Sequence, residues 1–416
     1  MNANHTRWAC YTGYITQAII NNLAPLLFII FQTQFAIPYE LLGRLILLNF
    51  TTQLITDIVA VKVVDRTGYR PPMILAHVVS VLGLISLGLL PSLLPSPYLG
   101  LSIAVMLCAI GGGLLEVLVS PIVDALPMPE KGKAAAMSLL HSFYCWGQVG
   151  VVLGTTLILA VFGRDWWQLL PILWAIVPLL NSIAFTRVPL PATVSEEQRT
   201  KLSTLFVNPA FLAALLLMLC AGASELTMSQ WSSLFAETSL GLPKVWGDIA
   251  GACLFGVFMG IGRIVYGFWG ERIPLVPALI GCGLLAICSY LLTVFASLPM
   301  FSLLGCMLCG LAVSLFWPGT FSLAARRFPL GGAAMFGVLA VMGDAGAAFG
   351  PWLAGAVADA SLSGAGFFGG IGSWLASLGI DGLRAGLFVA LIFPIAIVIT
   401  AWLYNLGPKP QGEAAH

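Results

Sequence analysis

Residues 61–70 read VKVVDRTGYR, a short charged stretch that follows one long apolar segment and precedes another. A shorter relative, GFWGER, stands at residues 267–272, again directly after a long apolar segment. Aligning the two places Asp65 against Glu271, 206 residues later, with an arginine after the acid in both cases. One such match is weak on its own, but it suggests that the chain repeats itself at about this spacing.

Other matches follow in the same order along the chain. They pair Asp57 with Arg263, Gly113 with Gly310, Pro121 with Pro318, and Gly147, Gly150 and Gly154 with Gly343, Gly346 and Gly350, at offsets of 196 to 206. Several matches in one order are hard to obtain by chance. Two parallel halves around a site at the middle of the membrane are a plan that many transporters share.

The composition indicates that lipid surrounds most of the chain. Of its 416 residues, 59% are hydrophobic and 8% are charged, against roughly 45–50% and about 25% in soluble domains. A segment of about 20 apolar residues can cross a bilayer as a helix. Proline, glycine and charged residues interrupt the apolar sequence and separate twelve such segments. They lie at residues 8–31, 40–63, 71–94, 98–126, 133–162, 166–186, 208–236, 245–270, 274–296, 299–325, 332–359 and 381–405.

The longest polar stretch, at residues 187–203, follows the sixth apolar segment. We interpret it as part of a linker at 187–207 between two halves, residues 1–186 and 208–416. The predicted fold is therefore an all-α membrane protein of twelve transmembrane helices in two pseudo-symmetric six-helix halves. A second irregular stretch, 361–380, is rich in glycine and serine and predicts a long loop with a short interfacial helix.

Basic residues predict the orientation, because cytoplasmic loops of membrane proteins carry an excess of Lys and Arg. With the N-terminus inside, thirteen of the 18 Lys and Arg residues fall on the cytoplasmic side and four fall outside, while Arg263 lies within a segment. We therefore expect a multi-pass protein of the plasma membrane with both termini in the cytoplasm.

Several other classes of function are disfavoured. The formal net charge of +1 offers nothing to attract a nucleic acid. The nine cysteines lie in apolar stretches without a paired metal spacing, and the sequence lacks a phosphate-binding loop, a zinc-protease motif and a G-x-S-x-G motif. We expect no enzyme activity, cofactor or metal. The expected partners are a small-molecule substrate, protons and the lipid bilayer, and we expect a monomer.

Four polar residues are expected near the middle of the membrane, on four different helices. Glu116 lies ten residues from the end of its segment, about 15 Å at 1.5 Å per residue, and Glu225, Asp344 and Asn22 lie comparably deep. A charge there costs about 2.5–3.5 kcal/mol on insertion scales, so each acid needs a cavity, a partner or a proton. Glu116 and Glu225 are the first candidates for binding substrate or carrying protons. A structural acid bonded to a neighbouring helix is the alternative, above all for Asp344, which stands between glycines.

Further candidates carry aromatic faces or amide groups, which suit the binding of sugars. They are Asn21, His141, Gln148, Gln230, Trp231 and Trp317. His141 and Gln148 stand seven residues apart and so share one helical face. A lone histidine in a helix is more often a packing residue, and a tryptophan in a membrane protein is often an anchor at the lipid interface, so both alternatives stay open.

The charged stretch of the opening resembles a signature of the major facilitator superfamily, and the resemblance covers essentially the whole chain. That signature is roughly G-x-x-x-D-R-x-G-R-[KR], and Val61 replaces its first glycine here. The matching residues are Asp65, Arg66, Gly68 and Arg70 in the first half and Gly267, Glu271 and Arg272 in the second. The resemblance implies alternating access, with helices one, four, seven and ten lining a central cavity.

The same resemblance implies a gate at the cytoplasmic mouth. We assign to it the signature residues together with Asp57, Asp124 and Arg263, and we expect them to latch the halves in the outward-open state. Asp124 lies near the inner mouth and about 80° around the helix from Glu116. Glu116 and Asp124 are therefore expected to have separate roles, Glu116 in the transport path and Asp124 in the gate.

Within the superfamily, the chain is similar to the fucose:proton symporter group. The stretch LLEVLVSPIVDAL supplies Glu116 with a proline five residues later, and Phe143 precedes Gly147 by four residues, as in that group. Asn22 stands where the group has an acid in its first helix, which leaves the coupling ion open.

The sequence thus predicts a secondary active transporter that moves a small polar solute, with a sugar as the first candidate, by proton symport. One alternative is a proton-coupled exporter of drugs or metabolites with the same fold. Another is an uncoupled or sodium-linked sugar carrier.

Overall fold

The computed structural model describes residues 2–126, 130–191, 205–269, 274–328 and 332–406. Within these ranges, all regular secondary structure is helical. Twelve stretches of the described chain are long and apolar enough to cross a membrane as helices, which confirms the number predicted from hydropathy.

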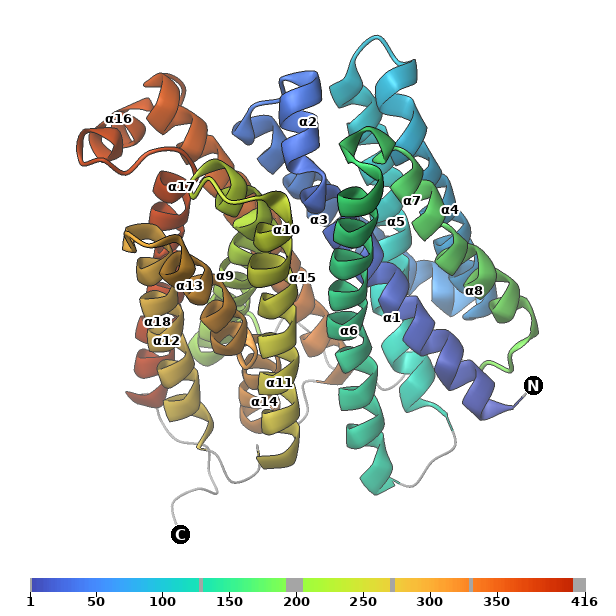
Figure 1. Ribbon diagram of the computed structural model, residues 1–416. Coiled ribbons are helices and arrows are strands. Elements are labelled where there is room, and N and C mark those ends of the chain that lie inside the picture. The colour runs from blue at the N-terminus through green and yellow to red at the C-terminus, as the bar shows by residue number, and fades with distance from the viewer. Residues whose placement is uncertain (1, 127–129, 192–204, 270–273, 329–331, 407–416) are drawn as a thin grey trace.

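The order of the helices along the chain can be followed in Figure 1. The first part of the chain forms α1 (Ala3–Leu26), α2 (Phe28–Phe35), α3 (Tyr39–Thr67), α4 (Arg70–Leu93), α5 (Pro97–Asp124), α6 (Glu130–Phe162), the 3-10 turn η1 (Arg164–Trp166), α7 (Leu169–Trp174) and α8 (Ile176–Arg187). The second part forms α9 (Pro209–Thr238), α10 (Lys244–Trp246), the π-helical turn η4 (Gly247–Cys253), α11 (Leu254–Trp269), α12 (Leu275–Phe295), α13 (Pro299–Val313), α14 (Phe316–Arg327), α15 (Gly332–Ser363), α16 (Gly369–Ser377), α17 (Gly382–Ala390) and α18 (Ile392–Leu406).

Several spans are broken rather than straight. The first span runs from α1 into α2, and the break at Leu27 follows Pro25, whose missing N–H group weakens the helix there. The eighth span opens with the wider turn of η4 before α11 begins. The short helix α16 lies in the glycine- and serine-rich stretch at 361–380, where an interfacial helix was expected.

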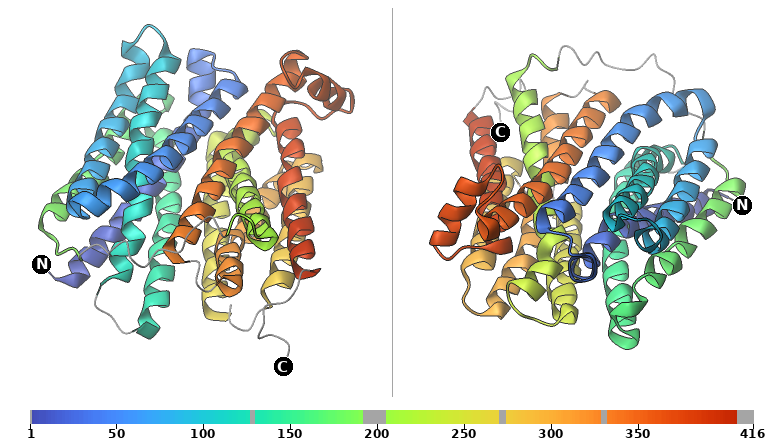
Figure 2. Two further views of the ribbon diagram at one scale, coloured as in Figure 1. Left: turned by 180° about the vertical axis from the view of Figure 1, so that it is seen from behind. Right: turned by 90° about the horizontal axis from the view of Figure 1, so that it is seen from above.

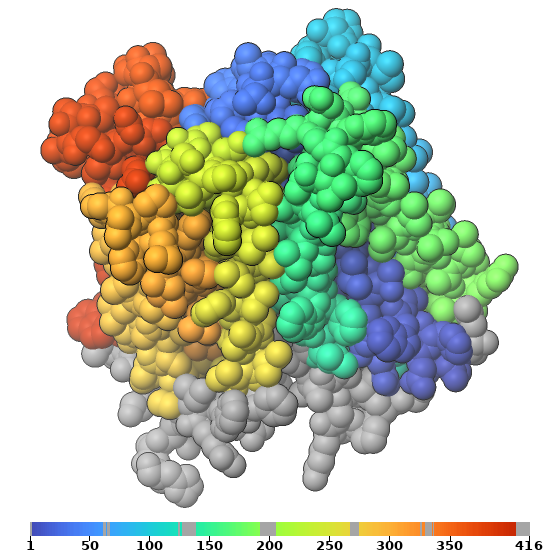
Figure 3. Space-filling model, viewed as in Figure 1, coloured from blue at the N-terminus to red at the C-terminus, as the bar shows by residue number. Residues whose placement is uncertain are grey.

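The helices form two groups that stand side by side, α1–α8 and α9–α18 (Figures 1 and 2). The start of α1 and the end of α18 lie at the same end of the bundle, as twelve crossings require. We call it the termini end, and we call the opposite end, with α2, α7, α10 and α16, the far end. The groups meet through α3 and α15 and through α6 and α11, and Figure 3 shows the second of these seams. The proposed boundaries at 187 and 207 stay a prediction, since residues 192–204 lie outside the described part of the chain.

Close packing at α15 depends on glycine. A Cβ atom at Gly346 would lie 1.8 Å from the carbonyl oxygen of Leu219 on α9, and one at Gly222 would lie 2.0 Å from the carbonyl oxygen of Gly343. Small residues allow helix backbones to approach this closely in membranes, where van der Waals packing drives association. Gly343 and Gly346, found as part of the sequence repeat, are therefore residues of the α9–α15 contact.

We expect Gly346→Ala to destabilise the protein, because the added methyl group would collide with the backbone of α9 rather than with a movable side chain. Overpacking of this kind costs about 1–3 kcal/mol, and the melting temperature of the purified protein in detergent should fall by several degrees. Gly337→Ala, in the same helix, is the matched control. A Cβ there meets nothing within 4 Å, so the higher helix propensity of alanine should leave stability equal or improved. Equal melting temperatures for both variants would contradict the packing argument.

Candidate functional site

Glu116 and Glu225, the two acids ranked first from the sequence, belong to one polar region between the helix groups. Glu116 is half-buried on α5, and its Oε2 accepts a hydrogen bond of 2.7 Å from Nε2 of Gln17 on α1. One turn further along α5, Ser120 is 3.0 Å from the hydroxyl of Tyr14, also on α1. Helix α1 thus supplies the first partners of the polar face of α5.

Glu225 lies on α9, in the second helix group, and only 6% of its surface is exposed. Its Oε1 faces the Arg263 guanidinium of α11 at 3.4 Å, and its Oε2 has no hydrogen-bond partner among the described residues. Arg263 also reaches into the first group, where NH1 is 3.6 Å from Sγ of Cys145 on α6. Arg263 was assigned to the gate from the sequence, whereas the structure places its side chain beside a central acid.

The two asparagines of α1 lie where this helix meets the second group. Oδ1 of Asn21 accepts hydrogen bonds from Asn49 at 3.1 Å and Gln53 at 2.7 Å, both on α3. The main-chain oxygen of Asn21 accepts one of 3.1 Å from Gln230 of α9. Asn22 donates to Ala18 within its own helix and lies 3.5 Å from the hydroxyl of Tyr144 on α6.

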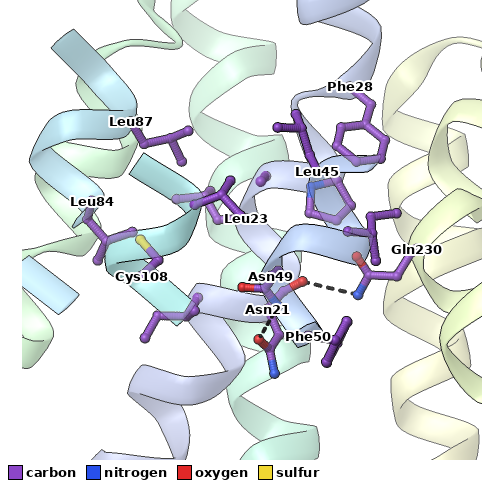
Figure 4. Close-up of a pocket in the computed structure, with 15 residues that line it drawn as sticks. Asn21, Leu23, Phe28, Leu45, Asn49, Phe50, Leu84, Leu87, Cys108 and Gln230 are labelled. Carbon is purple, nitrogen blue, oxygen red and sulfur yellow. Dashed lines mark hydrogen bonds between the residues drawn. The ribbon is translucent and has the colours of Figure 1, made fainter. Parts of the chain in front are cut away.

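A small cavity adjoins Asn21, Asn49 and Gln230 (Figure 4). Apart from these three amides its lining is apolar and comes mainly from α1, α3, α4 and α5, with Leu23, Leu84 and Cys108 among the residues drawn. It therefore lies mainly within the first helix group, and Gln230 of α9 borders it from the second. Neither Glu116 nor Glu225 is among its lining residues.

The remaining aromatic and amide candidates divide into two kinds. His141 is exposed, and its ring centroid is 5.1 Å from that of Tyr14. Gln148 is buried and donates to Ser229 of α9 at 3.2 Å, so it links the two groups. Trp231 is fully buried and donates to the carbonyl oxygen of Pro351 at 2.9 Å, which makes it part of the packing.

Trp317 has a different position. Its ring covers Gly343, where a Cβ atom would come within 2.4 Å of it, and its Nε1 has no partner among the described residues. Trp317 therefore packs directly against α15, one residue from Asp344.

Asp57 and Asp344 lie together, although the sequence assigned the first to the gate and the second to the site. Asp57 is on α3 and is 7% exposed, and Asp344 is on α15 and is 3% exposed. Their carboxyl groups are close enough for a hydrogen bond. The seam between α3 and α15 thus holds a pair of acids, one from each helix group.

The other gate residues are described only in part. Gly68 has a φ angle of +74°, a conformation that favours glycine, as the signature requires. Arg70 donates to the carbonyl oxygens of Phe185 at 2.7 Å and Val188 at 2.8 Å, within the first helix group. Outside the described part of the chain lie the side chains of Asp65, Arg66 and Asp124, the surroundings of Gly267, and Glu271 and Arg272 entirely. The cytoplasmic latch therefore stays a prediction.

At the far end of the bundle, contacts that sequence reasoning missed join the two helix groups. Asp359 of α15 accepts hydrogen bonds from the main-chain N–H groups of Tyr39 at 3.1 Å and Glu40 at 2.5 Å, at the start of α3. This helix has no capping side chain of its own at that end, since its N-cap residue is a proline. A residue of the second helix group therefore caps a helix of the first.

A second contact at the far end contains a buried ion pair. Nζ of Lys244 lies 2.7 and 2.9 Å from the two carboxylate oxygens of Asp248 in η4. Asp248 also accepts a hydrogen bond of 2.6 Å from Thr156 of α6, in the other helix group. The sequence could have indicated this ion pair, because Lys244 and Asp248 are four residues apart and residues at that spacing adjoin on a helix.

Sequence comparison decides the family. The profile described as the Major Facilitator Superfamily matches residues 10–351. The chain belongs to the Major Facilitator Superfamily. This confirms the resemblance noted from the sequence, and it makes the protein a transporter rather than an enzyme.

Solved structures share the fold of this major facilitator transporter along nearly its whole length. A D-xylose–proton symporter matches with a TM-score of 0.77 and 15% identity over 99% of this chain and 98% of that one. A bacterial homolog of the human lysosomal transporter Spinster matches at 0.74 and 15% over 97% of both chains. The E. coli fucose:proton symporter matches at 0.65 and 18% over 98% and 100%. Identities this low show the fold alone, and no curated protein sequence matches the chain.

We expect Arg263→Met to lower the melting temperature of this transporter, because it leaves Glu225 buried without its cation. Glu225→Gln in the same chain should restore much of the loss, since it removes the stranded charge. A double-mutant cycle on purified protein in detergent measures this coupling, expected at about 1–3 kcal/mol. Strictly additive losses would show that the two side chains do not act as a pair.

Proposed function

We propose that the protein is a secondary transporter of the plasma membrane that imports a small, hydroxyl-rich solute of the sugar class together with protons. The observation that carries this proposal is a set of unused hydrogen-bonding atoms in the central polar region. Oε1 of Gln17, Oε2 of Glu225 and Nε of Arg263 are buried and lack partners among the described residues. Two acceptors and one donor are thus available to a polar solute.

Aromatic side chains next to these atoms support a sugar. The rings of Tyr14 and His141 lie together, the Tyr14 hydroxyl meets Ser120 one turn from Glu116, and Tyr144 adjoins Asn22. Sugars present apolar ring faces to aromatic side chains and hydroxyl groups to polar ones. Because α1, α5 and α6 belong to one helix group and α9 and α11 to the other, a solute bound here would contact both halves, as alternating access requires.

Glu116 is the better proton carrier of the two central acids. Its carboxylate is hydrogen-bonded by the neutral amide of Gln17, whereas Glu225 faces the Arg263 guanidinium. A neighbouring cation favours the ionised form of a carboxylate, whereas an acid with only a neutral partner gains a proton more readily. We therefore assign proton coupling to Glu116 and solute binding to the Glu225–Arg263 pair.

The excess of Lys and Arg at the termini end places that end in the cytoplasm in this proposal. The contacts of Asp359 and Asp248 hold the far end closed, which corresponds to an inward-facing state. In the outward-facing state these contacts would be broken, and the gate expected from the sequence would close the cytoplasmic mouth.

Reconstituted vesicles with an inwardly directed proton gradient test the proposal. We expect accumulation of at least one sugar from a labelled panel above equilibrium, and a loss of about tenfold or more in Glu116→Gln, a size typical of removing a proton-transfer group. Asp165→Asn, an exposed acid in η1, is the matched control and should behave as the wild type. Undiminished accumulation by Glu116→Gln would refute the role of Glu116. Efflux of a drug-like cation without sugar uptake would identify an exporter, and dependence on sodium in place of protons would identify a sodium-linked carrier.

A further inference from the structure

The seam between α3 and α15 contains two acids, one from each helix group, whose carboxyl groups lie next to each other. The carboxyl groups of Asp57 and Asp344 lie within hydrogen-bonding reach, and both side chains are more than nine-tenths buried. Two ionised carboxylates at this range repel each other strongly, and a site that excludes water does not screen them. One of the two acids must therefore carry a proton that the other accepts.

The residues around the two acids form a closely packed site, which we call the niche. Oδ1 of Asp57 lies 2.7 Å from the place where a Cβ atom of Gly113 would be, so only glycine on α5 leaves room for it. One turn earlier on α3, the fully buried Gln53 packs against Gly112 and leaves its Oε1 without a partner among the described residues. Oδ1 of Asp57 and Oδ2 of Asp344 are likewise buried without partners in the described chain.

The charges around the niche favour protonation. Glu116 of α5 is a further acid that acts electrostatically on both members of the pair. The other helices packed against α3 and α15 carry further described titratable groups, among them Arg327 of α14, which acts electrostatically on Tyr404 of α18. His77 of α4 bonds to Asn181, Glu225 of α9 faces Arg263, and Arg384 of α17 donates to a main-chain oxygen.

We propose that Asp57 and Asp344 form a proton-binding site that exists only while α3 and α15 are packed together. Each acid comes from a different helix group, so separation of the groups divides the site. The shared proton then goes to water and two carboxylates remain, whereas renewed packing takes one proton up. The site links protonation to movement of the halves, in addition to the role assigned to Glu116. It rests on the proposed function only in assuming that the two groups move apart.

The test is the pH dependence of the melting temperature of the purified protein in detergent. The native pair holds one proton more than two separate aspartates hold in the unfolded chain at neutral pH. Stability should therefore fall as pH rises, here by several degrees from about pH 6 to about pH 8. In Asp57→Asn an amide donates to Asp344 without any proton, so the fall should be smaller. Asp165→Asn should keep the wild-type profile.

The same measurement decides whether the two acids act together. Asp344→Asn should flatten the profile as much as Asp57→Asn does, and the double variant should flatten it no further, because a single proton is shared. Unchanged profiles, or flattening that adds up in the double variant, would overturn the proposal. So would a saturable rise in melting temperature with sodium that both single variants lose, since the pair would then be a sodium site.

A transport measurement separates this proposal from the proposed function. Sugar accumulation in vesicles at several pH values should lose its pH optimum in Asp57→Asn while the order of preference among sugars stays the same. The stability profiles need no substrate, so they test the pair even if no sugar is transported. Conversely, the two single substitutions could flatten the pH profile of the melting temperature additively while proton-driven uptake persists. That result would refute the shared-proton site and would leave the proposed function supported.

Discussion

Every buried charge in this protein has to find its partner within the chain, because the hydrocarbon around the helices offers none. The structure meets this constraint in several ways. Asp248 pairs with a lysine one turn away, Glu225 faces the guanidinium of a neighbouring helix, and the half-buried Asp359 accepts from main-chain N–H groups. The carboxyl groups of Asp57 and Asp344 lie within hydrogen-bonding reach of each other. Apart from the Lys244–Asp248 pair, these contacts join different helices, so the charges contribute to the helix arrangement.

Helix α15 takes part in more of these contacts than its sequence suggests. Near its middle, Gly346 brings it against the backbone of α9, and Asp344 meets α3. Nearer its end, Asp359 caps the first turn of α3. The helix packing, the acid pair and the far-end contact therefore all involve one helix. A tilt of α15 would change the packing against α9, the acid pair and the Asp359 contact together. Movement of this helix would therefore link these contacts during a transport cycle.

The sequence was sufficient for the fold, because twelve apolar stretches of membrane length are an unambiguous pattern and the lipid enforces it. It also singled out Glu116 and Glu225 as candidates by their depth alone, and their roles stay a prediction. Depth does not give the rotation of one helix against another, and so the partners of Asp57 and Arg263 could not be foreseen. The internal repeat made these two residues equivalent, yet one meets an acid of the other half and the second an acid of its own half.

Asp359 was missed for a related reason, since a single acid near the end of an apolar segment belongs to no pattern. Its partners are main-chain atoms of Tyr39 and Glu40, which every amino acid except proline would supply. The identity of the side chains at the start of α3 is thus irrelevant to the bond, and the bond depends on one side chain alone. Related transporters could adjust how readily the far end opens by exchanging this residue, at no cost to the chemistry of the solute site.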